Sequence, residues 1–192
     1  METLVNDIAK TASKLLGRDD LAAFFEGAED AENVVVGADA QLMLTSVCLS
    51  AQEIAEEYFP LETNETVNSD EYCRLNFSDF DGKVHKVIAV YDSTGESCTF
   101  RTFDDFIKVS APNAAYVVYY DKVPDVVGIN ENVEHSAKVS ERILAYGACS
   151  HFCLCSLLYT EARMWSDRYS DALDQLRFEQ NNKRKVRKKW RV

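Results

Sequence analysis

The chain has 192 residues, of which 46% are hydrophobic and 28% charged, and its formal net charge is −11. These values are typical of a folded globular protein and argue against wholesale disorder, and no run of about eighteen apolar residues predicts a membrane span. The amino terminus contains acidic residues and lacks a continuous apolar stretch, so we expect no secretory signal there.

Residues 1–60 predict helices. Apolar residues recur at helical spacing from Leu4 to Leu16, and Gly17 is a typical C-terminal stop. A short second helix is expected over residues 19–26. A third helix should end before Pro60, and its apolar residues step by three or four: Leu44, Val47, Ala51, Ile54 and Tyr58.

Residues 61–124 predict an inserted β segment. Its first ten residues, LETNETVNSD, are polar and without periodicity, which predicts a linker. From Glu71 onward, β-branched and aromatic residues alternate with polar ones in EYCRLNF, KVHKVIAVY, SCTFRTF and AAYVVYY. The intervening DFDGK and DSTGE are turn sequences in which we expect glycine at positive φ. The pattern indicates about four antiparallel strands, with FDDFIKV as a further strand or a turn.

Residues 125–180 predict a return to helices after Pro124. A break near residues 158–160 divides this region into two helices, and the first is almost apolar all round from Ala145 to Tyr159. We therefore expect that helix to be the most buried element. The first apolar stripe comprises Val139, Ile143, Tyr146, Cys153 and Leu157, and the second comprises Ala162, Trp165, Tyr169, Ala172, Leu173 and Leu176.

The predicted fold class is α+β, in which N- and C-terminal helices form one bundle and an antiparallel β meander is inserted between them. Residues 1–60 and 125–180 are expected to form the bundle, and residues 61–124 the β insertion. Residues 181–192 then remain as a basic tail.

The sequence contains no common catalytic or phosphate-binding motif, so we expect no catalytic residue and no cofactor. Cys149, His151, Cys153 and Cys155 lie close together, but one helix cannot direct all four at a metal and no second cysteine pair is present. DFDGK lacks the further oxygen ligands of a calcium loop. We therefore expect no metal, and we expect all six cysteines to be reduced in a cytosolic producer cell.

Basic charge is concentrated at the carboxyl end. Seven of the 21 Lys and Arg residues lie in the last ten, so the first 182 residues carry 14 basic against 32 acidic side chains, a formal charge of −18. This asymmetry predicts a binding segment. Its residues are Lys183, Arg184, Lys185, Val186, Arg187, Lys188, Lys189, Trp190, Arg191 and Val192.

Three interpretations of this tail remain open. Its cations and its tryptophan could bind nucleic acid through phosphates and base stacking. It could be a solvated end without a partner. It could also dock as an extended peptide on an acidic partner, since Val186, Trp190 and Val192 would share one face of a strand.

The order of elements and the sequence VSERILAYGACSHFCLCSLLYTEARMWSDRYSDALDQLRF, followed by the basic, tryptophan-containing end, resemble the head-to-tail adaptors of tailed bacteriophages. These are also called gatekeeper, head-completion or tail tubular A-type proteins. The passage YVVYYDKVPDVV resembles the family's transition from its β segment into the final helices. The resemblance covers most of the chain as architecture and about residues 140–192 as a residue pattern.

The resemblance implies a non-enzymatic virion protein, made in the host cytoplasm and located at the head–tail junction. Such adaptors form a ring, commonly of twelve subunits, between the portal protein and tail or neck proteins, and they continue the DNA channel. It implies that Lys183–Val192 docks on the portal with Trp190 as anchor, while the ring contacts viral DNA only transiently. The alternatives are another structural ring of the neck or tail, or a DNA-binding protein that uses its basic tail.

Overall fold

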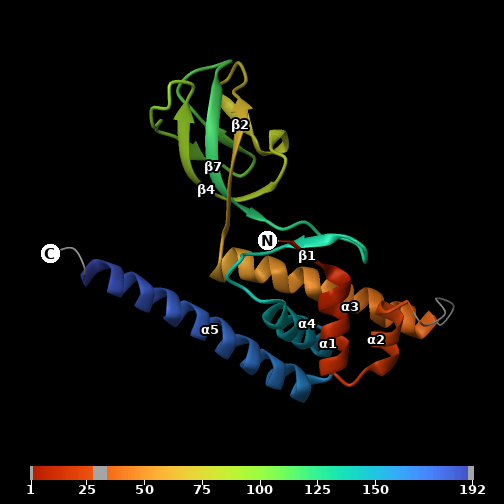
Figure 1. Ribbon diagram of the computed structural model, residues 1–192. Helices are drawn as coiled ribbons and strands as arrows, with labels where there is room; N and C mark the ends of the chain where they lie inside the picture. The colour runs from red at the N-terminus through yellow and green to blue at the C-terminus, as the bar shows by residue number, and fades with distance from the viewer. Residues whose placement is uncertain (1, 28–33, 190–192) are drawn as a thin grey trace. The chain divides into compact units, whose positions relative to one another are not determined.

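The computed structural model describes the backbone of residues 2–27 and 34–189, and the side chains of residues 2–27 and 36–179. The chain divides into two compact units, one containing Met1–Ile54 and Val126–Val192 and the other Ala55–Asp125. The first unit is mainly helical and the second is built from β-strands (Figure 1). The predicted α+β fold class is thus confirmed.

The helical unit follows the predicted periodicity closely. Its helices are α1 (Val5–Leu15), α2 (Asp19–Phe25), α3 (Val34–Glu53), α4 (Glu141–Cys155) and α5 (Tyr159–Lys189). Gly17 adopts a φ of +70° after α1, as its place at a helix end predicted. The helical path of α3 continues as a five-residue π-helix, Ile54–Tyr58, and ends before Pro60.

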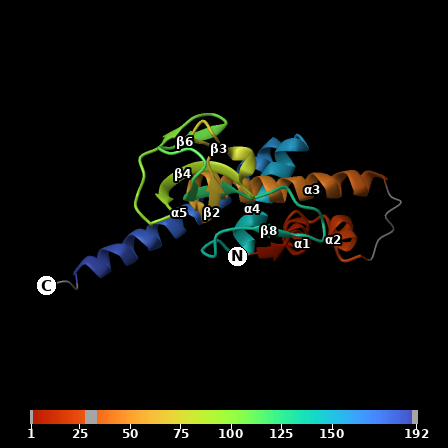
Figure 2. The ribbon, with the colours of Figure 1, turned by 90° about the horizontal axis from the view of Figure 1, so that it is seen from above.

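Helix α4 lies at the centre of this unit, where it packs against α1, α3 and α5 (Figures 1 and 2). We expected this helix to be the most buried element, and eight of its 15 residues, between Ile143 and Cys153, are buried. The prediction was wrong for residues 154–159, whose large apolar side chains are exposed. They lie at the turn between α4 and α5, where no other element of the described chain covers them.

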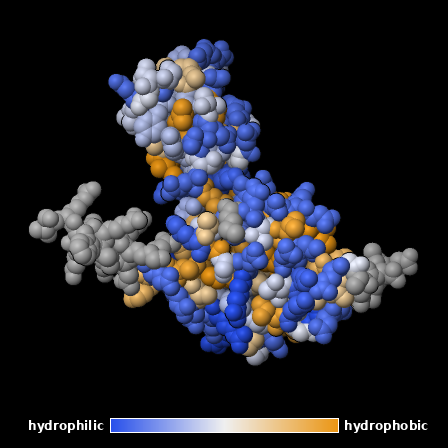
Figure 3. All heavy atoms as spheres, in the orientation of Figure 1, coloured by the Kyte–Doolittle hydropathy of each residue, from blue (hydrophilic) through white to orange (hydrophobic). Residues whose placement is uncertain are grey.

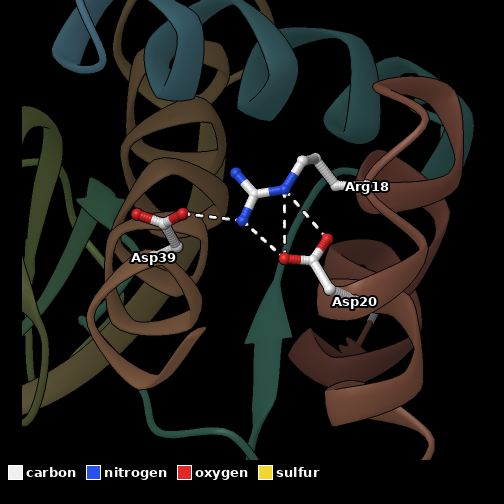
Figure 4. Close-up of polar contacts among 3 residues, drawn as sticks. All are labelled: Arg18, Asp20 and Asp39. Carbon is white, nitrogen blue, oxygen red and sulfur yellow. Dashed lines mark hydrogen bonds and ion pairs between the residues drawn. The ribbon is translucent and has the colours of Figure 1, made fainter. Parts of the chain in front are cut away.

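An ion-paired arginine joins the corner between α1 and α2 to α3 (Figure 4). The Arg18 guanidinium donates hydrogen bonds to the carboxylate of Asp20, from Nε to Oδ1 at 2.9 Å and from Nη2 to Oδ2 at 2.7 Å. The same Nη2 donates to Asp39 Oδ2 at 2.7 Å. The hydrogen bond from Arg18 is the main reason that the pKa of Asp20 lies below its ordinary value.

Residues 125–140 are not helical, which corrects the prediction for this stretch. They form a loop and a short strand, β8 (Asn132–Glu134), which pairs antiparallel with β1 (Glu2–Leu4). Buried His135 fixes the pairing, because its Nε2 lies 2.9 Å from the Thr3 hydroxyl and its Nδ1 lies 3.1 Å from the Ser136 carbonyl oxygen. Burial also lowers the pKa of His135, which favours the neutral ring.

The β unit contains two three-stranded antiparallel sheets. One has the order β2 (Leu61–Asn68), β7 (Ala115–Val123), β4 (Lys83–Asp92), and the other β3 (Arg74–Asn76), β6 (Phe106–Lys108), β5 (Arg101–Thr102). The sheets are therefore not the meander that was expected, since β7 lies between two strands that precede it in the chain. The buried core of this unit comprises Val67, Leu75, Phe80, Val90, Ile107, Val109, Tyr116, Val118 and Tyr120.

The expected linker LETNETVNSD is largely strand β2, which pairs with β7 along its whole length. Its inward-facing Glu65 is stabilised by hydrogen bonds, because the Tyr120 hydroxyl donates to Oε1 and the Asp81 N–H donates to Oε2 at 2.9 Å. A polar residue therefore occupies an inward position, and the usual apolar alternation is missing. In the neighbouring turns, Gly95 has the expected positive φ of +84°, whereas Gly82 does not.

Candidate partner-binding segment

Helix α5 carries the basic segment that the sequence singled out. It is one continuous helix of 31 residues, Tyr159–Lys189. No proline or glycine occurs between these ends, and Ala, Leu, Arg, Lys, Glu and Gln, which favour helices, are frequent. The first seven residues of the predicted docking segment, 183–189, are helical, while Trp190, Arg191 and Val192 lie outside the described residues.

The first half of α5 is anchored in the helical unit. Four residues at spacings of three and four form its buried stripe: Ala162, Trp165, Tyr169 and Leu173. The Trp165 ring packs against Tyr146 of α4 with ring centroids 5.8 Å apart, and within α5 the Arg168 guanidinium lies 4.8 Å from the centroid of the Trp165 ring. The contact between Trp165 and Tyr146 is part of the packing of α5 on α4.

Burial ends at Leu173. From Asp174 to Glu179 no side chain is buried, and Phe178 is 67% exposed. The backbone nevertheless stays helical to Lys189, a further length of about 24 Å at the usual rise per residue. Both ribbon views show this part of α5 continuing past the other helices of its unit (Figures 1 and 2).

The charge of α5 reverses along its length. Glu161, Asp167, Asp171, Asp174 and Glu179 contribute exposed carboxylates to the described side chains. Residues 183–189, KRKVRKK, contribute six cations and no acid. Successive helical residues are rotated by about 100°, so the six basic positions do not fall on one narrow stripe of the helix. Cations near a helix C-terminus also interact favourably with the helix dipole, which by itself stabilises this end.

Of the three open interpretations of the tail, docking as an extended peptide does not match residues 183–189 as the structure describes them, since they are helical. In a helix, alternate residues do not share a face, so the strand-like alignment considered for this segment does not apply to residues 183–189. The signal that could have predicted this state was the uninterrupted run of helix-forming residues after Leu173.

The cysteine and histidine residues near the end of α4 do not converge on one point. Cys149 and Cys153 are buried, whereas Cys155 is exposed, and His151 Nε2 pairs instead with Glu53 Oε2 at 3.1 Å. Burial is the main reason that the pKa of Cys149 is raised to about 12. All six thiols are unpaired, and the described part of the chain contains no group of three His, Cys, Asp or Glu side chains arranged to hold a metal.

Among the residues that the structure describes, no helix has the length and apolar character needed to cross a membrane. No model of a known protein family matches the sequence, and a comparison with curated proteins also finds no match.

Proposed function

We propose that this chain is a structural virion protein that forms a ring between the portal and the tail of a tailed bacteriophage. The observation that carries the proposal is α5, which is packed on α4 as far as Leu173, has no buried side chain from Asp174 to Glu179, and continues as a helix into the basic sequence 183–189. The α+β organisation, with a β unit inserted into a helical one, supports it. The proposed partners are the portal protein, tail or neck proteins and further copies of the chain, at the head–tail junction.

The physical requirements of such a ring agree with this chain. A docking arm must be held firmly at one end and stay accessible at the other, and α5 has a buried stripe as far as Leu173 and no buried side chain from Asp174 to Glu179. Repetition of the arm around a ring makes a modest affinity per arm sufficient. An acidic body, with a formal charge of −18 before the last ten residues, also suits a channel through which DNA slides without adhering.

The test mixes the full chain with the portal protein of the same genome and observes the complex by negative-stain electron microscopy and mass photometry. We expect portal rings to gain a collar of subunits. Removal of residues 183–192 should abolish the collar and leave the circular dichroism of the remaining chain unchanged except for the missing helix. A matched variant replaces each Lys and Arg of 183–192 by Gln, which keeps the length and helix propensity but removes the charge. A collar that persists in both variants contradicts the assigned role of α5.

DNA binding through the same segment is the second candidate, because six of the seven helical residues 183–189 are Lys or Arg. It predicts that the isolated chain binds duplex DNA with an affinity that falls steeply as salt rises, and that the Gln variant loses this binding. In the adaptor proposal, the repulsion between DNA and the acidic body keeps binding weak at physiological salt. Fluorescence anisotropy with labelled DNA over a salt series separates the two functions.

A further inference from the structure

A cluster of exposed apolar side chains lies at the turn between α4 and α5, far along the chain from the basic segment. We call residues 154–159 the α4–α5 apex. Leu157 is 68% exposed and Tyr159 is 64% exposed, and Leu154 and Leu158 are also largely in solvent. Met164, one turn into α5, is exposed as well. Side chains of this number and exposure form a patch on the order of a few hundred Å², the size at which a surface patch indicates an interaction site.

The backbone of the apex is strained at Leu157, one of these exposed residues. Leu157 has a φ of +62°, in the left-handed region that L-residues with a large side chain avoid. The helix end is closed by a hydrogen bond from the Leu158 N–H to the Cys153 carbonyl oxygen at 2.9 Å, a geometry that usually has glycine at this position. A leucine here adds strain, and its exposed side chain gains no burial within the chain.

Strain that persists without a compensating contact in the same chain is typical of a functional site. The apex also contains Cys155, an exposed thiol, between two of the exposed leucines. The end of α4 does not need these apolar residues, since a glycine at position 157 with polar neighbours would close the helix equally well.

We infer that the α4–α5 apex is a contact surface for a second copy of this chain, with the two apices packed on each other about a two-fold axis. Among the described residues of the helical unit, the other large exposed apolar side chains lie on separate elements: Leu4 in β1, Leu49 in α3, Val126 in the loop after β7 and Phe178 in α5. The face drawn in Figure 3 likewise shows hydrophobic residues of this unit interspersed with hydrophilic ones. Within the part of the helical unit that the structure describes, the apolar surface that best matches the apex is therefore the apex of another copy.

The estimated area of the apex patch also supports a second copy of the chain as its partner. Two patches of a few hundred Å² bury together, with their polar rims, on the order of 1,000 Å², which is the lower limit for a specific interface. A contact of this size gives weak association, in keeping with an acidic chain whose net charge opposes it. An anionic lipid or nucleic-acid surface fits less well, because Glu161 is the nearest charged residue after the apex. The inference does not rest on the ring proposed above, which uses the other end of α5. Neighbours in a cyclic ring contact each other through unlike patches, so the two-fold contact joins copies that are not neighbours in one ring.

Sedimentation equilibrium of the full chain from about 1 to 100 µM tests the inference. We expect a monomer–dimer equilibrium that salt does not weaken, because the contact is apolar. Leu157→Gly removes the exposed side chain and also relieves the left-handed strain, so it should raise the midpoint of thermal unfolding of the monomer and raise the dimer dissociation constant about tenfold or more. Val126→Ser, which removes an isolated exposed apolar residue, should leave the dimer unchanged.

A short bismaleimide provides a second measurement, because its two ends react with the thiols of two Cys155 residues that face each other across the axis. We expect covalent dimers in the full chain and none in Cys155→Ser. A chain that stays monomeric up to about 100 µM would overturn the inference, as would a Leu157→Gly variant that unfolds at a lower temperature and dimerises normally. Flotation of the monomer with phosphatidylcholine vesicles, lost in Leu157→Gly, would overturn it too and assign the apex to lipid.

Discussion

Gly147 allows α3, α4 and α5 to approach one another, and its replacement by alanine tests how tightly these helices pack. A Cβ atom at position 147 would lie 2.6 Å from Ser50 Oγ, 3.0 Å from Ser50 Cβ and 3.0 Å from Tyr169 Cε2. The Ser50 Cβ is fixed to the α3 backbone, so rotation of a side chain cannot relieve that contact. Gly147→Ala therefore requires a shift of one helix against another.

The expected effect is the difference between two opposing terms. Alanine is favoured over glycine within a helix by about 1 kcal/mol. Overpacking of a well-packed core costs about 1–3 kcal/mol. Because two elements meet the new atom at 3.0 Å or less, we take the upper part of that range and expect Gly147→Ala to lower the free energy of unfolding by about 1–2 kcal/mol.

Gly37→Ala is the matched control, since Gly37 lies in α3 of the same unit and no atom lies within 4 Å of its added Cβ. This variant should gain up to about 1 kcal/mol from helix propensity alone. Urea unfolding followed by circular dichroism at the helical band measures both variants. Ser50→Ala removes the nearest contacting atom, so the double variant with Gly147→Ala should lose less stability than the two single changes predict together. If both glycine variants gain stability equally, the close approach at Gly147 is not a constraint.

Three further predictions concern ionisable groups. Hydrogen bonding from Arg18 lowers the pKa of Asp20, so the Asp20 carboxylate stabilises the fold above its unfolded pKa and this contribution is lost as pH falls. In thermal unfolding, Asp20→Asn should therefore be less stable than the parent chain at pH 7 and equally stable near pH 3. Burial raises the pKa of Asp121, whose Oδ1 accepts no hydrogen bond from the described residues. The protonated carboxyl is therefore favoured in the fold, and its stabilising contribution is lost as pH rises. Asp121→Asn should raise the thermal unfolding midpoint at pH 7 but not below pH 3. Iodoacetamide labelling followed by mass spectrometry should modify exposed Cys155 well before Cys149, whose pKa burial raises to about 12.

The helices could be predicted because their apolar periodicity depends only on residues that are close together in the sequence. The starts and ends of α1 and α2, and the break before α5, follow from apolar spacing, Gly17 and the residues around Tyr159. The strands β4 and β7 were found for the same reason, since their side chains alternate along the chain. The fold class therefore depends mainly on local pattern, which a single sequence contains.

The elements that were missed depend on distant partners. The sequence of strand β2 resembles a linker because its polar Glu65 is stabilised by a hydrogen bond from the hydroxyl of Tyr120, 55 residues away. The β1–β8 pair depends on the contact between Thr3 and His135, which are 132 residues apart. Both use a polar group inside the unit that is favourable only once its hydrogen-bond partner is in place. Periodicity cannot identify such positions, because their side chains are hydrophilic.

The site shows the same division between local and distant information. The cluster of cations at 183–189 could be identified from composition, but its helical state depends on α5 being nucleated and anchored through Trp165, Tyr169 and Leu173. A short isolated peptide of that sequence would form a marginal helix, because nucleation is unfavourable. Joined to an anchored helix, the same residues need only propagate it.

The helical state changes what a partner of this segment must look like. An extended peptide would add to the edge of a sheet and would lose much of its conformational freedom on binding. A helix that continues from a packed anchor loses less freedom, and six of its residues 183–189 are Lys or Arg. The proposed partner surface is therefore an acidic groove or ring of grooves that surrounds a helix, and not an unpaired sheet edge. Proline in place of Asn182 separates these alternatives: it breaks α5 before the basic segment while keeping every charge, so it should abolish docking in a groove and leave strand addition intact.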